Sequence, residues 1–167
     1  MTGSPSIPTA DLCDRLGASA VVALPIFRDY GGWLAFAGRA VTLRVRDDNG
    51  LVRRTLETAG DGRVLVVDGG GSLRCALLGD MLAGLGVKNG WAGVIVHGCV
   101  RDSAALRELP IGVKALATHP ARSAKEGTGE RDVAVTIAGV TIAPGAYITA
   151  DVDGIVITPG PPIGGAS

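Results

Sequence analysis

Apolar and polar residues alternate along the chain with two different periods. Arg39–Arg46 (RAVTLRVR) alternates with a period of two, which predicts a strand with one buried face. Val64–Val67 and Val94–Val96 are short and wholly apolar, as is typical of strands buried on both faces of a sheet. Further strands are predicted at shorter apolar segments, namely Val21–Leu24, Ile111–Ala117, Tyr147–Ala150 and Ile155–Ile157.

Helix signals separate several of these strands. Thr9 followed by Asp11 predicts a helix that is capped by the Thr9 side chain and ends at Gly17. Amphipathic spacing and residues that stop a helix predict three more helices, at Leu51–Ala59, Gly79–Lys88 and Ser103–Glu108. Helices and strands therefore alternate through the middle of the chain.

The pattern changes after residue 120. Residues 121–130 read as a polar loop, and Val133–Ile137 and Val140–Ile142 flank Ala138-Gly139 as the two strands of a hairpin. Helix–strand alternation followed by hairpins predicts an α/β fold with a mixed sheet. We expect a single domain over residues 1–158, followed by a disordered low-complexity tail over residues 159–167.

Composition excludes several classes of protein. The 167 residues are 47% hydrophobic, with 16 basic and 16 acidic side chains, so the chain lacks the basic excess that binds phosphates. We therefore expect a folded core and no direct nucleic-acid partner. The chain contains no run of about 18 apolar residues, so we predict no membrane span. The absence of a signal-peptide pattern, and three cysteines without a Cys-x-x-Cys pair, predict a cytoplasmic protein with free thiols.

A strand leads into the glycine run Asp68-Gly69-Gly70-Gly71. A dinucleotide loop would need a third glycine where Arg74 stands, and no Gly-Lys-Ser/Thr follows. The run therefore favours a tight loop over a nucleotide site, and we expect Gly69–Gly71 to shape the backbone around a different site nearby.

Two short motifs carry the strongest chemical signal. Gly79-Asp80-Met81-Leu82 opens a helix whose first amides can bind a carboxylate or phosphate. Arg101-Asp102 follows a buried strand, where Arg offers a bidentate fork and Asp offers a hard oxygen ligand. With only two histidines in the chain, a metal would depend on carboxylates and water, which favours Mg²⁺ or Mn²⁺. Together the motifs indicate a site for a metal and an α-keto acid.

These motifs lie within a longer similarity. VVDGGGSLRCALLGDMLAGLGVKNGWAGVIVHGCVRD, continued by LRELPIGVKALATHPARSAKEGTGERDV and ADVDGIVI, closely resembles the RraA-like family over roughly residues 8 to 158. That family contains 4-hydroxy-4-methyl-2-oxoglutarate aldolases and the regulator of ribonuclease activity A. The resemblance implies an αββα sandwich with a swivelling-domain-like core, assembled as homotrimers or hexamers with sites between subunits.

The resemblance also implies roles for individual residues. Gly79, Asp80, Met81 and Leu82 would bind the keto-acid substrate, largely through backbone amides, Arg101 would contact the same substrate, and Asp102 would hold the divalent metal. Asp102 favours the aldolase over the ribonuclease regulator. Two departures from the aldolase pattern are Ala105, where an acid is usual and Glu108 is the nearest one, and His97, which replaces an Asp.

The expected activity is a metal-dependent (class II) retro-aldol cleavage of 4-hydroxy-4-methyl-2-oxoglutarate to two pyruvates, with oxaloacetate decarboxylation as a side activity. Arg101 would stabilise developing negative charge and Asp80 would help to move the proton. A Schiff-base aldolase is the competing chemistry, with Lys114 as the lysine in an apolar run. The alternative function is a protein-binding regulator of a ribonuclease E-type machine, for which Glu130, Asp151 and Asp153 could form an acidic face.

Overall fold

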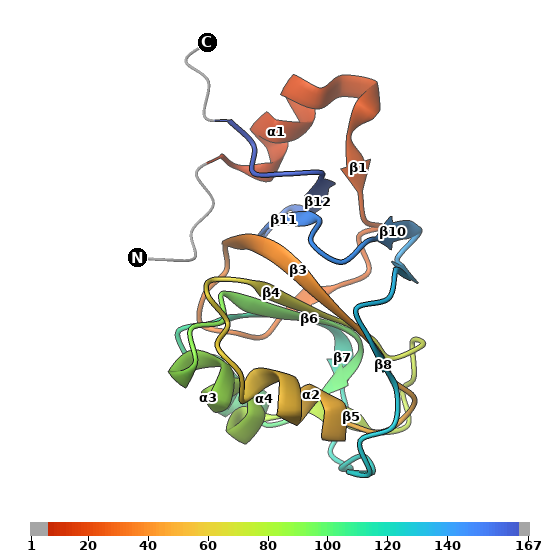
Figure 1. The fold of residues 1–167 in the computed structure, drawn as a ribbon. Helices are drawn as coiled ribbons and strands as arrows, with labels where there is room; N and C mark the ends of the chain where they lie inside the picture. The colour runs from red at the N-terminus through yellow and green to blue at the C-terminus, as the bar shows by residue number, and fades with distance from the viewer. Residues whose placement is uncertain (1–6, 164–167) are drawn as a thin grey trace.

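A curled mixed sheet forms the centre of the protein in a computed structural model that describes residues 7–163 (Figure 1). The helices are α1 (Thr9–Leu16), the 3₁₀ turn η1 (Gly17–Ser19), α2 (Gly50–Leu56), α3 (Asp80–Lys88) and α4 (Ser103–Leu106). The strands are β1 (Val21–Val22), β2 (Arg28–Asp29), β3 (Phe36–Arg44), β4 (Val64–Asp68), β5 (Ala76–Leu78), β6 (Gly93–Val100), β7 (Gly112–Thr118), β8 (Glu130–Arg131), β9 (Val135–Ile137), β10 (Val140–Ile142), β11 (Tyr147–Asp151) and β12 (Gly154–Thr158).

The order of strands in the large sheet is β1-β12-β11-β3-β4-β6-β7-β2, with β5 added beside β6 and β8 beside β3. Strands β3, β4, β6 and β7 are parallel, because helical connections return the chain to the same end of the sheet each time. Strands β11 and β12 pair in antiparallel fashion and extend the sheet from β3. The predicted α/β class with a mixed sheet is therefore confirmed.

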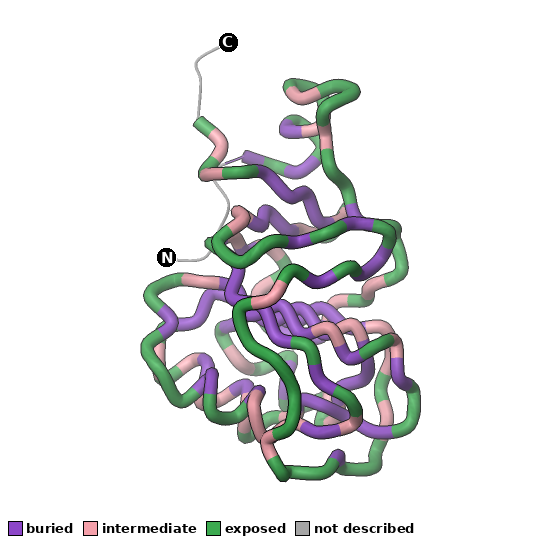
Figure 2. The backbone as a smooth tube through the Cα atoms, turned by 45° about the vertical axis from the view of Figure 1, so that its right-hand side comes forward, coloured by how far each residue is buried: buried purple, intermediate pink, exposed green. Residues whose placement is uncertain are grey.

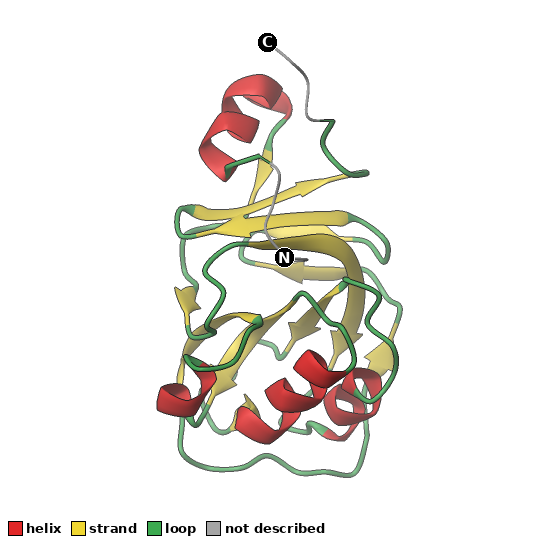
Figure 3. Ribbon diagram, turned by 90° about the vertical axis from the view of Figure 1, so that its left-hand side faces the viewer, coloured by secondary structure: helices red, strands yellow, loops and turns green. Residues whose placement is uncertain are grey.

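Three apolar clusters show how the layers are stacked. The first fills the space between the parallel strands and the helices α2, α3 and α4, and it includes Leu65, Val94 and Leu106 (Figure 3). The second joins the other face of those strands to β9–β12. The third packs Leu12 of α1 against Val156 of β12. Helix, sheet, sheet and helix thus follow one another, and burial is concentrated in the strands between them (Figure 2).

Three strands were not predicted from the sequence, and the reasons are local. β2 and β8 are two residues long, and β5 has only three, so none offers enough alternation to be seen as a strand. β8 begins at Glu130, the last residue of the segment that we predicted as a polar loop. β3 begins at Phe36, three residues before the predicted start. The predicted hairpin is present as the antiparallel pair β9 and β10.

The predicted cap of the first helix was wrong. Thr9 is the first helical residue, Pro8 precedes it, and no side chain caps the helix. The Thr9 hydroxyl and amide instead donate to the two carboxylate oxygens of Asp151 at 2.6 and 2.8 Å. A residue 142 positions away in the chain therefore holds the start of α1, and this partner could not be found from local sequence.

The predicted tail is described only as far as Ile163, whose carbonyl accepts a hydrogen bond from Arg15 at 3.2 Å. Residues 164–167 lie outside the described residues, so the predicted disorder of the tail stays a prediction. Among residues 7–163, no helix is long and apolar enough to cross a membrane.

The Asp151 anchor gives a prediction for stability. Burial works to raise the pKa of Asp151, but hydrogen bonds from Thr9, Asp153 and Gly154 outweigh it and hold the pKa below its ordinary value of 3.8. Because the folded-state pKa is lowered, the carboxylate stabilises the fold above about pH 4, and this contribution is lost as pH falls through the folded-state pKa. Asp151→Asn should lower the free energy of unfolding by about 1–2 kcal/mol at pH 7.

Urea unfolding at pH 7 and below pH 4 measures this effect, and the difference from the wild-type protein should shrink at the lower pH. Asp153→Asn is the matched control, since Asp153 is exposed and should change the free energy of unfolding by less than about 0.5 kcal/mol. Equal losses in the two variants would show that Asp151 is not the anchor.

Candidate active site

The two motifs that the sequence singled out meet at one edge of the sheet. Leu78 at the end of β5 pairs with Val100 at the end of β6, and the Arg101 amide donates to the Leu78 carbonyl at 2.9 Å. Because β5 and β6 are parallel, the residues that follow them emerge side by side. Gly79-Asp80 and Arg101-Asp102 are thereby brought together, as predicted.

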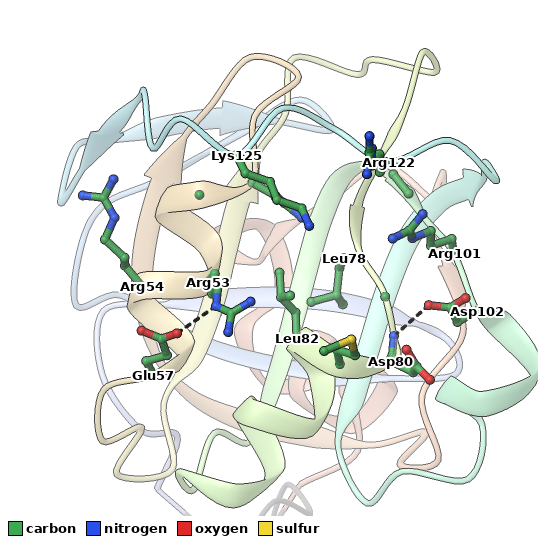
Figure 4. Close-up of a pocket in the computed structure, with 15 residues that line it drawn as sticks. Arg53, Arg54, Glu57, Leu78, Asp80, Leu82, Arg101, Asp102, Arg122 and Lys125 are labelled. Carbon is green, nitrogen blue, oxygen red and sulfur yellow. Dashed lines mark hydrogen bonds and ion pairs between the residues drawn. The ribbon is translucent and has the colours of Figure 1, made fainter.

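Gly79 allows this approach because it has no side chain. A Cβ at position 79 would lie 2.6 Å from Oδ2 of Asp102, so the Asp102 side chain would have to move, and 3.3 Å from Cγ of Arg101, a tight contact that needs a small shift. The Asp80 amide, the first of helix α3, donates to Oδ2 of Asp102 at 3.2 Å (Figure 4). Asp102, which follows β6, therefore caps α3, which follows β5. This interaction was not predicted from the sequence.

Asp102 reaches this position through an uncommon backbone conformation. Its φ of 57° and ψ of 40° lie in the left-handed region, which Asp and Asn tolerate better than most residues. Asp102 directly precedes α4 but makes no side-chain cap there. Its carboxylate is turned to α3 instead.

A cavity of about 360 Å³ opens beside these motifs (Figure 4). All six predicted site residues line it: Gly79, Asp80, Met81, Leu82, Arg101 and Asp102. Met81 stands at the rim with 74% of its surface exposed. The amides of Met81 and Leu82 belong to the first turn of α3 and have no intrahelical acceptor, so they are available to an anion.

The cavity lining also carries charges that the sequence did not assign to a site. Arg53, Arg54 and Glu57 come from α2, and Arg122 and Lys125 come from the loop before β8. With Arg101 the lining holds five cations, against the three carboxylates of Glu57, Asp80 and Asp102. A cavity of this charge suits an anionic ligand with more than one negative group.

The buried carboxylate of Asp48 brings this loop to α2. It accepts hydrogen bonds from the amides of Gly50, Glu126 and Gly127 at 2.9–3.0 Å. Burial works to raise the pKa of Asp48, but the amide hydrogen bonds prevail and lower the pKa below its ordinary value. The ionised Asp48 thus fixes both cationic segments at the cavity. The only signal in the sequence was a turn-forming Asp-Asp-Asn-Gly, with nothing to indicate a partner near residue 126.

Oxygen donors in the cavity fit a hard divalent cation. Within the described part of the chain, no group of three or more His, Cys, Asp and Glu side chains could form a complete metal cage. Mg²⁺ and Mn²⁺ are commonly held by one or two carboxylates, with water and substrate completing the coordination. Asp102 and Asp80, side by side at the start of α3, supply such a donor set.

Other residues considered from the sequence lie elsewhere. Gly69–Gly71 do not line the cavity, so their expected part in shaping it was wrong. Gly70 and Gly71 have positive φ, and the Gly70 amide donates to Asp68, which confirms a tight loop. His97 projects near this loop, with its Nδ1 3.8 Å from an Asp68 oxygen and its ring against Phe27.

The remaining candidates are also outside the cavity lining. Ala105 and Glu108 are exposed around the end of α4. Lys114 is 3% exposed, and its ammonium lies 2.9 Å from Oδ1 of Asp29 and donates to the Asp151 carbonyl at 2.7 Å. The three cysteines are free thiols, as predicted: Cys13, Cys75 and Cys99.

Fold and site together define an α/β protein with a cationic cavity beyond the carboxyl ends of parallel strands, and the charge of this cavity suits a small anion. The sequence model of the RraA-like family (Aldolase/RraA) matches residues 9–157. The chain belongs to the RraA-like family.

Similar proteins carry more than one name. A relative from Deinococcus radiodurans is 62% identical over 90% of this chain and 94% of its own, and one from Alkalilimnicola ehrlichii is 59% identical over 91% and 94%. Both carry the provisional name 4-hydroxy-4-methyl-2-oxoglutarate aldolase. The structure of the RNA-processing inhibitor RraA from Thermus thermophilis is 52% identical, with a TM-score of 0.92 over 97% of this chain and 98% of that chain.

The close packing at Gly79 can be tested by substituting Ala for Gly79 and, separately, for Gly84 of the adjoining helix α3. Gly79→Ala should displace Arg101 and Asp102 and weaken binding of pyruvate to the cavity at least about tenfold, because the added Cβ needs the space they occupy. Calorimetric titration with pyruvate in the presence of Mg²⁺ measures the change.

Gly84→Ala is the control. Gly84 lies within α3, and no atom would come within 4 Å of its Cβ, so this variant should bind pyruvate normally and gain about 0.5–1 kcal/mol of stability from better helix propensity. Normal pyruvate binding by Gly79→Ala would contradict the packing described here.

Proposed function

We propose that the protein is a divalent-metal-dependent lyase that cleaves 4-hydroxy-4-methyl-2-oxoglutarate to two pyruvates, with oxaloacetate decarboxylation as a side activity. The observation that supports it best is the meeting of Arg101, Asp102 and the α3 amino terminus in one cationic cavity. The names of the similar proteins from Deinococcus and Alkalilimnicola point to the same substrate.

Substrate binding would begin at the α3 amino terminus. The first-turn amides of Met81 and Leu82 would donate hydrogen bonds to the carboxylate next to the keto group, at the positive end of the helix dipole. The Arg101 guanidinium, which points into the cavity in Figure 4, would lie beside the keto oxygen. These contacts would fix the reacting end and leave the rest of the molecule directed along the cavity.

Asp102, with help from Asp80, would hold the metal, and the metal when bound would supply Lewis-acid stabilisation of negative charge on the keto oxygen. Arg101 would add to that stabilisation as charge develops, a contribution of about 3 kcal/mol for comparable donors. A metal site would also give a reason for Asp at position 102, since a neutral amide is a weaker ligand for a hard cation.

The bond changes follow from this placement. The C4 hydroxyl loses its proton, the C3–C4 bond breaks, and its electron pair forms the enolate of one pyruvate while C4 becomes the keto carbon of the other. Asp80, at the cavity wall, would move the hydroxyl proton through a water and help to return one to C3. Loss of CO₂ from oxaloacetate leaves the same enolate, so one site can perform both reactions.

Pyruvate release from 4-hydroxy-4-methyl-2-oxoglutarate, measured with Mg²⁺ and then with EDTA, tests the proposal. Turnover should require the metal, and Asp102→Asn should lower kcat/KM at least about a hundredfold, because Asn keeps the left-handed backbone but loses the charge. Asp61→Asn is the matched control, since Asp61 also has positive φ but lies outside this cavity. Undiminished turnover in EDTA, or in Asp102→Asn, would refute the metal-dependent mechanism.

A Schiff-base mechanism through Lys114 is disfavoured by the structure. A nucleophilic lysine must be neutral and face the substrate, whereas the Lys114 ammonium is paired with Asp29 and lies outside the cavity. Borohydride reduction in the presence of pyruvate should therefore leave the mass of the protein unchanged. A mass increase of one reduced pyruvate on Lys114, detected by peptide mass spectrometry, would reverse this conclusion.

The comparisons do not favour a ribonuclease regulator, since many of the relatives are named as aldolases. Of the three residues considered for an acidic face, Asp151 accepts a hydrogen bond from Thr9, Glu130 lies 3.5 Å from Arg44, and Asp153 is exposed, so that face stays a prediction. Assembly as a homotrimer or hexamer stays a prediction. Exposed apolar side chains on and after β1 are consistent with a contact between subunits: Val21, Val22, Leu24 and Ile26.

A further inference from the structure

The cavity has two charged ends that differ in chemistry. One end is the proposed reacting site, with Arg101, Asp102 and the start of α3. At the other end Arg53 of α2 and Lys125 of the loop before β8 point inward, as Figure 4 shows. Leu78 and Leu82 lie between the two ends and provide an apolar wall.

Arg53 is presented in a defined position. Its Nε lies 2.9 Å from Oε1 of Glu57, one helical turn further along α2. That contact uses Nε, so the terminal nitrogens of the guanidinium can still form a two-pronged contact with a carboxylate. The neighbouring Arg54 also lines the cavity, but its guanidinium is turned outward toward Gly127 (Figure 4).

We propose that Arg53 is a specificity-determining residue that binds the distal carboxylate of the substrate, so that the site selects dicarboxylic 2-oxo acids over monocarboxylic ones. This selectivity rests on the proposed function, which places the proximal carboxylate at α3. Arg53 and Lys125 then meet the second negative group, and the apolar wall meets the carbon chain between the two carboxylates. A monocarboxylic acid of the same length would leave the cations at the far end without a ligand.

A pair of acids that do not undergo aldol cleavage tests this selectivity directly. 2-Oxoglutarate and 2-oxopentanoate have the same chain length, and they differ in having a carboxylate or a methyl group at the distal end. Calorimetric titration in the presence of Mg²⁺ should show about fivefold tighter binding of 2-oxoglutarate to the wild-type protein, a modest preference because Arg53 is half exposed. Arg53→Ala should reduce that preference to less than twofold, mainly by weakening the binding of 2-oxoglutarate. Arg53→Lys should keep part of the preference.

Lys88→Ala is the control, because it removes one positive charge at an exposed side chain of α3 that does not line the cavity. It should keep the wild-type preference. An equal loss in Arg53→Ala and Lys88→Ala would overturn the assignment, as would a wild-type protein with no preference or with no measurable binding of either acid. A clear preference in a protein that fails to cleave 4-hydroxy-4-methyl-2-oxoglutarate would sustain the dicarboxylate subsite and reject only the proposed reaction.

Discussion

The parallel pairing of β5 with β6 is the constraint on which the candidate site depends. Leu78 opposite Val100 places two chain segments side by side where they leave the sheet, and the missing side chain of Gly79 lets Arg101 and Asp102 close on the start of α3. A shift of one residue in this register would turn the side chains of β5 to the opposite face. The cationic residues from α2 and from the loop at residue 125 line the same cavity as this edge.

The sequence predicted the main parts of this arrangement but not the interaction that assembles it. Apolar runs predicted β4 and β6, and the Gly-Asp and Arg-Asp motifs predicted a shared site, which the structure places around one cavity. β5 was missed because three apolar residues carry no periodicity. Arg53 and Lys125 were missed because Asp48 joins their segments through contacts 78 and 79 residues apart, which local pattern cannot reveal.

Carboxylates buried in the fold and carboxylates at the cavity have different tasks. Asp48 and Asp151 accept several hydrogen bonds each, and those bonds hold the pKa of both below the ordinary value. Such groups bind the backbone of distant segments and have few lone pairs left for a ligand. Asp80 and Asp102 are exposed at the cavity and make only the one contact between them, so they keep oxygens for a cation or a proton. A net charge of zero over the whole chain thus coexists with a cationic cavity and with dispersed structural anions.

The cap at Asp102 is compatible with the proposed metal binding because a carboxylate has two oxygens. The Asp80 amide donates a hydrogen bond to Oδ2 of Asp102, so Oδ1 of Asp102 would be free to bind the metal. The cap also orients that second oxygen, since it holds the carboxylate against the start of α3 in a backbone conformation that few residues adopt. The same helix end would receive the substrate carboxylate on its next two amides. One helix terminus would therefore position the proposed metal ligand and the proposed substrate relative to each other, and this coupling would give a physical reason for an Asp directly after Arg101.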